Sequence, residues 1–212
     1  MNLEPSRSAG ACAAWNLKPI ILVIMAAKSN GKLFIISAPS GAGKTTLCRE
    51  ALKRFKDITY SISYTTRKPR NGEQDGIDYY FITKEEFKRK IENNKWAEWA
   101  EVYGNFYGTS AEFLDTCLAS GKHILLDIDV QGAVQIKNRY PDSVTIFIMP
   151  PSLETLRARL KSRGTDTRQV IERRLKTAKK EIGEKNLYRH VIINDELSKA
   201  VSELIKIIES YL

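Results

Sequence analysis

Short apolar runs alternate along much of the chain with longer stretches predicted to be helical. The runs at 33–37, 124–127 and 144–148 are almost entirely hydrophobic, which is typical of strands buried on both faces. Predicted helices at 46–55 and 130–140 follow the first two runs. This alternation predicts an α/β fold with a parallel sheet core covered by helices on both faces.

The alternation is interrupted between residues 60 and 117. Strands and turns are expected at 59–64, 79–82 and 103–109. A capping box at Thr83 predicts a helix start, and a further helix is expected at 110–120. Hairpin-like material of this kind within an α/β pattern predicts an inserted subdomain.

The C-terminal third begins with a strongly charged, helical segment. Leu153, Leu156 and Leu160 form one apolar stripe, so the arginines of this segment are expected on the opposite, solvent-facing side. A last strand is expected at 191–193. The final helix has apolar residues at core spacing, namely Leu197, Val201, Leu204 and Ile208.

The first thirty residues differ from the rest: 1–17 are mostly small or polar and lack clear periodicity. The apolar run 20–27 is too short to span a bilayer, and the strand at 33–37 follows so soon that export is disfavoured. We expect 1–30 to be a poorly ordered extension, with Met25 as the natural first residue. The three cysteines (Cys12, Cys48 and Cys117) are far apart, which favours reduced thiols in a cytoplasmic protein.

The clearest chemical motif is the sequence APSGAGKT, which lies between the strand at 33–37 and the helix at 46–55. Gly41 and Gly43 allow a tight turn whose N–H groups converge on an anion, while Lys44 can reach the β/γ-phosphates and the Thr45 hydroxyl can hold Mg²⁺. The loop opens with Ala38 instead of the usual glycine. The alternative is an ordinary glycine-rich turn. The expected ATP-binding positions of this loop are Ala38, Pro39, Ser40, Gly41, Ala42, Gly43, Lys44, Thr45 and Thr46.

The charge balance agrees with an anionic partner. The 34 Lys and Arg residues outnumber the 25 Asp and Glu residues, giving a net charge of +9 among 212 residues. Nucleic acid or nucleotide phosphates would suit this charge, and so would mere excess of surface lysine. The phosphate loop favours a nucleotide. The isolated His123 and His190 are expected to be structural.

Residues 31–212 resemble guanylate kinase. The resemblance rests on six separated motifs: SAPSGAGKTT at 37–46, TTRKPRNGEQDGIDYYF at 65–81, EWAEVYGNFYGTS at 98–110, LDIDVQG at 126–132, RLKSRGT at 159–165 and VIINDE at 191–196. It implies the fold of a P-loop nucleoside monophosphate kinase. The core would be 31–62, 118–150 and 186–212, the GMP-binding insert 63–117 and the helical lid 151–185.

The resemblance also implies how GMP is held. The phosphate and base would be bound by Ser63, Arg67, Arg70, Tyr79, Tyr107 and Thr109. Glu98 would accept hydrogen bonds from guanine N1 and N2, with Asp129 as a second acceptor. From the residues alone, Arg67 and Arg70 could equally form a solvated basic turn, and Glu98 could be a surface glutamate that follows a helix.

For phosphoryl transfer the resemblance implies four catalytic cations, namely Lys44, Arg159, Arg163 and Arg174. Arg163 would bind ATP and Arg174 would also contact GMP. Thr45 and Asp127 would order Mg²⁺, the aspartate through water, and Asn194 would contact adenine. The expected reaction passes the γ-phosphoryl group of ATP to GMP, without nucleic-acid or membrane partners.

Two alternatives remain at this stage. A non-enzymatic guanylate-kinase-like interaction module would share the fold, but generally lacks a working ATP loop. A related ribose-phosphate kinase would keep the phosphate loop. Its sugar substrate has no guanine base, so the presence of Ser63, Glu98 and Asp129 argues against this alternative. The sequence leaves open whether the protein is a monomer or a homodimer.

Overall fold

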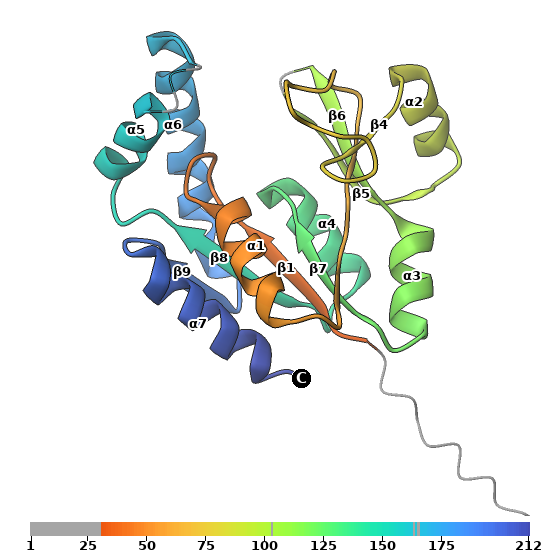
Figure 1. Ribbon diagram of the computed structural model, residues 1–212. Helices are drawn as coiled ribbons and strands as arrows, with labels where there is room; N and C mark the ends of the chain where they lie inside the picture. The colour runs from red at the N-terminus through yellow and green to blue at the C-terminus, as the bar shows by residue number, and fades with distance from the viewer. Residues whose placement is uncertain (1–30, 103, 163, 165) are drawn as a thin grey trace, which may run out of the picture.

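The computed structural model describes residues 31–102, 104–162, 164 and 166–212. The predictions about the extension 1–30, and the prediction for Arg163, fall outside the described residues. The described part forms a central sheet with helices on both sides, and two further units project from it (Figure 1).

The central sheet has the parallel arrangement that the alternating pattern predicts. Its five strands lie in the order β2 (Ile58–Tyr60), β7 (His123–Asp127), β1 (Leu33–Ser37), β8 (Val144–Met149) and β9 (His190–Ile193). Each neighbouring pair is parallel, and Ile36 of β1 lies opposite Asp127 of β7. The carboxyl ends of β1 and β7 therefore meet at one edge of the sheet, where parallel folds place their ligands.

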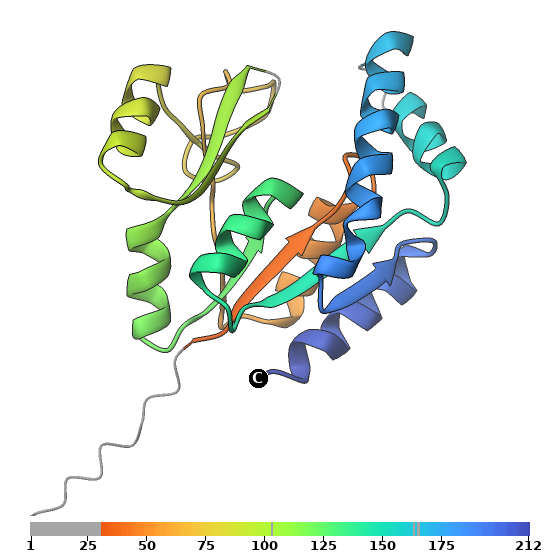
Figure 2. The ribbon, with the colours of Figure 1, turned by 180° about the vertical axis from the view of Figure 1, so that it is seen from behind.

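Helices bury both faces of this sheet (Figure 2). Phe34 and Ile36 pack in the cluster that includes α1 (Lys44–Arg54) and α7 (Leu197–Glu209). Their neighbours Leu33 and Ile35 face the other cluster, with α3 (Ala111–Ala119) and α4 (Val130–Arg139). Burial of each large side chain contributes about 1.5–3 kcal/mol. In α7, Leu204 and Ile208 are buried as expected, but Leu197 at the first position of the helix is exposed.

The inserted material forms a second sheet with the strand order β4 (Tyr80–Phe81), β3 (Tyr64–Thr65), β6 (Asn105–Ser110) and β5 (Trp96–Val102). Strand β5 was not anticipated. Helix α2 (Lys84–Glu92) begins at the expected cap, where Thr83 Oγ1 accepts the Glu86 N–H. The helix is fixed by Phe87, which stacks on Trp96 and on Phe106.

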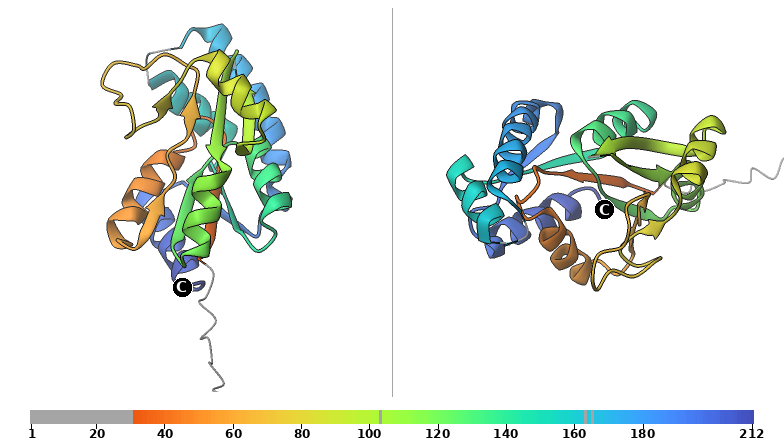
Figure 3. Two further views of the ribbon diagram at one scale, coloured as in Figure 1. Left: turned by 90° about the vertical axis from the view of Figure 1, so that its right-hand side faces the viewer. Right: turned by 90° about the horizontal axis from the view of Figure 1, so that it is seen from above.

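The charged segment forms α5 (Leu153–Ser162) and α6 (Arg168–Gly183), followed by the short helix η1 (Lys185–Leu187). The predicted leucine stripe is confirmed, because Leu156 and Leu160 are buried against Ile171 and Leu175. This helix pair and the second sheet stand on opposite sides of the loop between β1 and α1, as the view from above also shows (Figures 1 and 3).

Candidate functional site

The phosphate loop occupies the turn between β1 and α1. Gly41 and Gly43 both have a φ of 99°, a left-handed conformation that side chains disfavour, so glycine is needed at both positions. Gly43 is the N-cap residue of α1, and the Ala42 N–H donates to Pro39 O over 3.0 Å. The loop thus presents a helix N-terminus, which favours anions. Ala38 is buried, whereas Thr45 and Thr46 are exposed at the start of α1.

Lys44, Thr45 and Asp127 come together at the carboxyl ends of β1 and β7. Lys44 Nζ forms an ion pair of 2.5 Å with Asp127 Oδ1 and donates to the Ile128 carbonyl over 2.8 Å. Thr45 Oγ1 lies 3.4 Å from Asp127 Oδ2. Burial alone would lower the pKa of Lys44, but the charge and hydrogen bond of Asp127 outweigh it and raise that pKa. Lys44 is therefore protonated, and its ammonium group is held in place by Asp127 and the Ile128 carbonyl.

Two of these residues, Thr45 and Asp127, are the ones predicted to hold Mg²⁺. The Thr45 hydroxyl and the Asp127 carboxylate offer two hard oxygen ligands beside the phosphate loop. Mg²⁺ usually takes one or two such protein ligands and completes its shell with water and substrate phosphates. The residues present fit that ion.

Glu98 projects from β5 and is only 5% exposed, so its interpretation as a surface glutamate is wrong. The Thr109 hydroxyl donates to Glu98 Oε1 over 2.6 Å. Burial raises the pKa of Glu98 to about 7, more than the hydrogen bond from Thr109 lowers it. Asp129, the N-cap of α4, accepts the Gly132 N–H, and this places a second acceptor close to Glu98.

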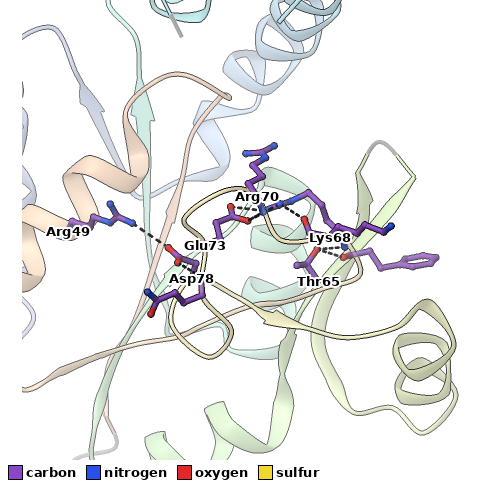
Figure 4. Close-up of polar contacts among 9 residues, drawn as sticks. Arg49, Thr65, Lys68, Arg70, Glu73 and Asp78 are labelled. Carbon is purple, nitrogen blue, oxygen red and sulfur yellow. Dashed lines mark hydrogen bonds and ion pairs between the residues drawn. The ribbon is translucent and has the colours of Figure 1, made fainter. Parts of the chain in front are cut away.

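Arg67 lies in the loop between β3 and β4 and is held by Glu73, a residue that the sequence interpretation missed. Its Nη1 and Nη2 donate to the two carboxylate oxygens of Glu73 over 2.9 and 2.8 Å. Glu73 also accepts the backbone N–H of Arg70 over 2.7 Å (Figure 4). The sequence did hold a signal for this role: Glu73 comes three residues after Arg70, directly after the Asn71-Gly72 turn, where a carboxylate can accept hydrogen bonds from the loop. Arg67 and Glu73 are largely buried, so the solvated-turn alternative is wrong for Arg67. The side chain of Arg70 is exposed.

Aromatic side chains flank Arg67. The Arg67 guanidinium carbon lies 5.4 Å from the centre of the Tyr79 ring, and Tyr79 meets Tyr107 edge to face. Arg67, Tyr79 and Tyr107, which are expected to bind the GMP phosphate, thus lie close together. Ser63 precedes β3, where its carbonyl accepts the Tyr80 N–H.

Two of the predicted catalytic arginines reach the phosphate loop from the charged helices. Arg159 Nη2 donates to Asn194 O over 2.8 Å, and its Nη1 lies 3.4 Å from Ala42 O. Arg174 Nη1 donates to Ser40 Oγ over 3.1 Å and pairs with Asp166 at 3.4 Å. The expectation that the arginines all face solvent is therefore wrong for these two, because the helices lie beside the loop and offer them acceptors.

Asn194, at the end of β9, is 5% exposed. Its Nδ2 donates to the Ala42 carbonyl over 2.7 Å, so its amide supports the phosphate loop. A Cβ atom at Gly43 would lie 2.3 Å from that nitrogen, which is a second reason for glycine there.

Comparison with known proteins agrees with this geometry. The guanylate kinase family model matches residues 30–211, nearly the whole described chain. The chain belongs to the guanylate kinase family. It is 53% identical to the guanylate kinase of Geobacter metallireducens over 177 residues, which is 84% of this chain and 87% of that one. It is 48% identical to the guanylate kinase of Neisseria gonorrhoeae over 186 residues, covering 88% and 91% of the two chains.

A solved structure supports the fold of this family member. The crystal structure of guanylate kinase from Anaplasma phagocytophilum matches with a TM-score of 0.70 and 36% identity, over 86% of this chain and 87% of that one. The predicted P-loop nucleoside monophosphate kinase fold is thereby confirmed. Among the described residues, none of the helices has the length and apolar character needed to cross a membrane.

Proposed function

We infer that this chain catalyses the transfer of the γ-phosphoryl group from ATP to GMP, giving ADP and GDP. The observation that carries the inference is the coexistence of a complete phosphate loop, with Lys44 paired to Asp127, and a buried carboxylate at Glu98. The first suits a triphosphate, and the second suits a base that offers hydrogen-bond donors.

Guanine is the base that Glu98 fits. Guanine presents donors at N1 and N2, and an ionised carboxylate accepts both. Adenine has an unprotonated N1, which would face the carboxylate without a hydrogen bond. Such a buried mismatch discriminates by about 10⁴-fold. Asp129 lies near enough to Glu98 to serve as the second acceptor, while Thr109 keeps Glu98 in place.

The GMP phosphate is assigned to Arg67, Arg70, Tyr79 and Tyr107, with Ser63 at the same subdomain. Guanidinium groups bind a dianionic phosphate through paired hydrogen bonds. The ordered turn around Glu73 supports this assignment, because it holds Arg67 beside both tyrosines.

The ATP side rests on the phosphate loop and the cations around it. Lys44 binds the β/γ-phosphates, and Arg159, Arg163 and Arg174 neutralise the migrating group, with Arg174 shared with GMP. Asn194 supports the loop and borders the adenine site. Mg²⁺, held by Thr45 and through water by Asp127, would neutralise charge on the β- and γ-phosphates. The transfer is direct and in line, and needs no covalent enzyme intermediate.

The proposed division of the chain follows from these roles. Residues 31–62, 118–150 and 186–212 form the core, 63–117 the GMP-binding insert and 151–185 the lid. Closure of the lid and insert over both nucleotides would exclude water from the phosphoryl group. Such an enzyme of nucleotide metabolism would work in the cytoplasm, as a monomer or a homodimer.

A coupled assay of ADP release tests this function directly. The purified protein is given Mg·ATP and, in turn, GMP, AMP, CMP, UMP and ribose phosphates. Turnover that is strongly selective for GMP is the expected result. Absence of turnover would favour the interaction-module alternative, and turnover with a ribose phosphate would favour the sugar-phosphate kinase.

A further inference from the structure

The missing side chain of Gly132 leaves room for two carboxylates. A Cβ atom at this position, in the first turn of α4, would lie 2.5 Å from Glu98 Oε2 and 3.5 Å from Asp129 Oδ1. The backbone of Gly132 is helical and lacks a positive φ, so alanine would suit the main chain. What excludes a side chain here is therefore the carboxylate of Glu98.

Glycine is otherwise a poor choice at this position. In a helix, glycine is less favourable than alanine because it loses more conformational freedom on folding. Gly132 uses only its backbone, donating its N–H to Asp129 Oδ1 over 2.8 Å. An alanine could donate the same hydrogen bond from its backbone. The presence of glycine, despite its lower helix stability, is therefore explained by the space that the missing Cβ leaves.

Glu98 has little freedom to avoid a methyl group. It is 5% exposed, and its other oxygen is bonded to the Thr109 hydroxyl. A Cβ atom at position 132 would push Oε2 away by roughly one ångström to restore normal contact. The displaced atom is the end of a side chain, so the fold can accommodate the methyl group. The carboxylate of Glu98, however, would no longer lie in its original position.

We propose that Gly132 is a specificity-determining position: its missing side chain lets the Glu98 and Asp129 carboxylates converge on one guanine base. Gly132 itself touches no reacting atom and acts through the placement of Glu98. The proposal rests on the proposed function, in which Glu98 reads guanine N1 and N2.

The test is Gly132→Ala, with Gly183→Ala as the matched control. Gly183 also lies in a helix, and a Cβ atom there would meet nothing within 4 Å. Gly132→Ala should raise the KM for GMP by about 10- to 100-fold, since a misplacement of one ångström has effects of that size. The KM for ATP should change by less than about two-fold, because the phosphate loop is untouched. The control should behave as the wild type.

Two readouts separate this role from general damage to the fold. The melting temperature of Gly132→Ala should stay level or rise by a few degrees, because alanine favours the helix. The preference for GMP over inosine monophosphate, which lacks the 2-amino group, should fall in Gly132→Ala. A merely structural role would leave that preference unchanged and would lower the melting temperature.

A double variant isolates the contact. In a Glu98→Ala background the methyl group has room, so adding Gly132→Ala should cause no further loss of GMP use. If Gly132→Ala alone fails to fold, recovery of folding in the double variant supports the proposal, and continued failure overturns it. Normal GMP kinetics in folded Gly132→Ala also overturns it. Lack of GMP turnover in the wild type would instead refute the proposed function.

Discussion

Both terminal nitrogens of Arg67 are hydrogen-bonded to the carboxylate of Glu73, at 2.9 and 2.8 Å. The same carboxylate accepts the backbone N–H of Arg70. One acidic side chain therefore organises the loop that carries both arginines proposed to bind the GMP phosphate (Figure 4). The hydrogen bonds from Arg67 lower the pKa of Glu73, so the carboxylate is ionised at neutral pH.

Glu73→Ala should raise the KM for GMP by about ten-fold, because Arg67 loses two charge-assisted hydrogen bonds that hold its guanidinium in place. Glu73→Gln keeps one acceptor and should give a smaller increase. Steady-state kinetics with varied GMP measure both effects, and Glu50→Gln on α1, where Glu50 pairs with Lys53, is the control. A lower KM in Glu73→Ala would mean that Glu73 competes with the substrate phosphate, contrary to this interpretation.

Lys44→Ala should reduce kcat by about 10²–10³-fold or more, because the cation that stabilises charge on the transferred group is removed. The fold should persist, with unchanged circular dichroism. Lys53→Ala serves as the control, since Lys53 is exposed on the same helix and forms an ion pair with Glu50 on the surface. A rate near that of the wild type would exclude Lys44 from the mechanism.

Glu98→Gln should reduce kcat/KM for GMP by about 10- to 100-fold, because the amide can accept only one of the two guanine donors. ATP binding should change little. Equal losses for both nucleotides, measured by steady-state kinetics, would contradict a guanine-reading role for Glu98.

The raised pKa of Glu98 predicts a pH dependence of GMP use. Guanine needs the ionised acceptor, so kcat/KM for GMP should fall as the pH drops below about 7, and Glu98→Gln should lack this inflection. The native state holds this proton more tightly than the unfolded state, whose pKa is near 4.5. The wild type should therefore lose stability relative to Glu98→Gln as the pH rises from about 4.5 through 7, as measured by melting temperatures.

Asn194→Ala should weaken both ATP and GTP as phosphoryl donors, each by several-fold. The reason is that Asn194 Nδ2 bonds to the Ala42 carbonyl of the phosphate loop, which any triphosphate would use. Kinetics with the two donors measure the ratio. A loss confined to ATP would show instead that Asn194 acts by reading adenine.

Several features were predictable because they depend on local sequence. The phosphate loop lies where a buried strand meets a helix, and the left-handed φ of Gly41 and Gly43 follows from the tight turn. The Thr83 cap and the leucine stripe of α5 are equally local. The family motifs added the residues proposed to bind GMP and ATP, whose roles remain predictions.

Other features required the tertiary structure. Strand β5 and the burial of Glu98 depend on pairing with β6 and on packing against α4, which no local pattern specifies. The contacts of Arg159 and Arg174 with the phosphate loop arise because α5 and α6 stand beside it. The sequence by itself thus determined the strand-and-helix core and the turn that suits phosphate, since both follow from periodicity and backbone sterics. Only the folded chain decided which charged groups are desolvated, because desolvation depends on neighbours that are distant along the chain.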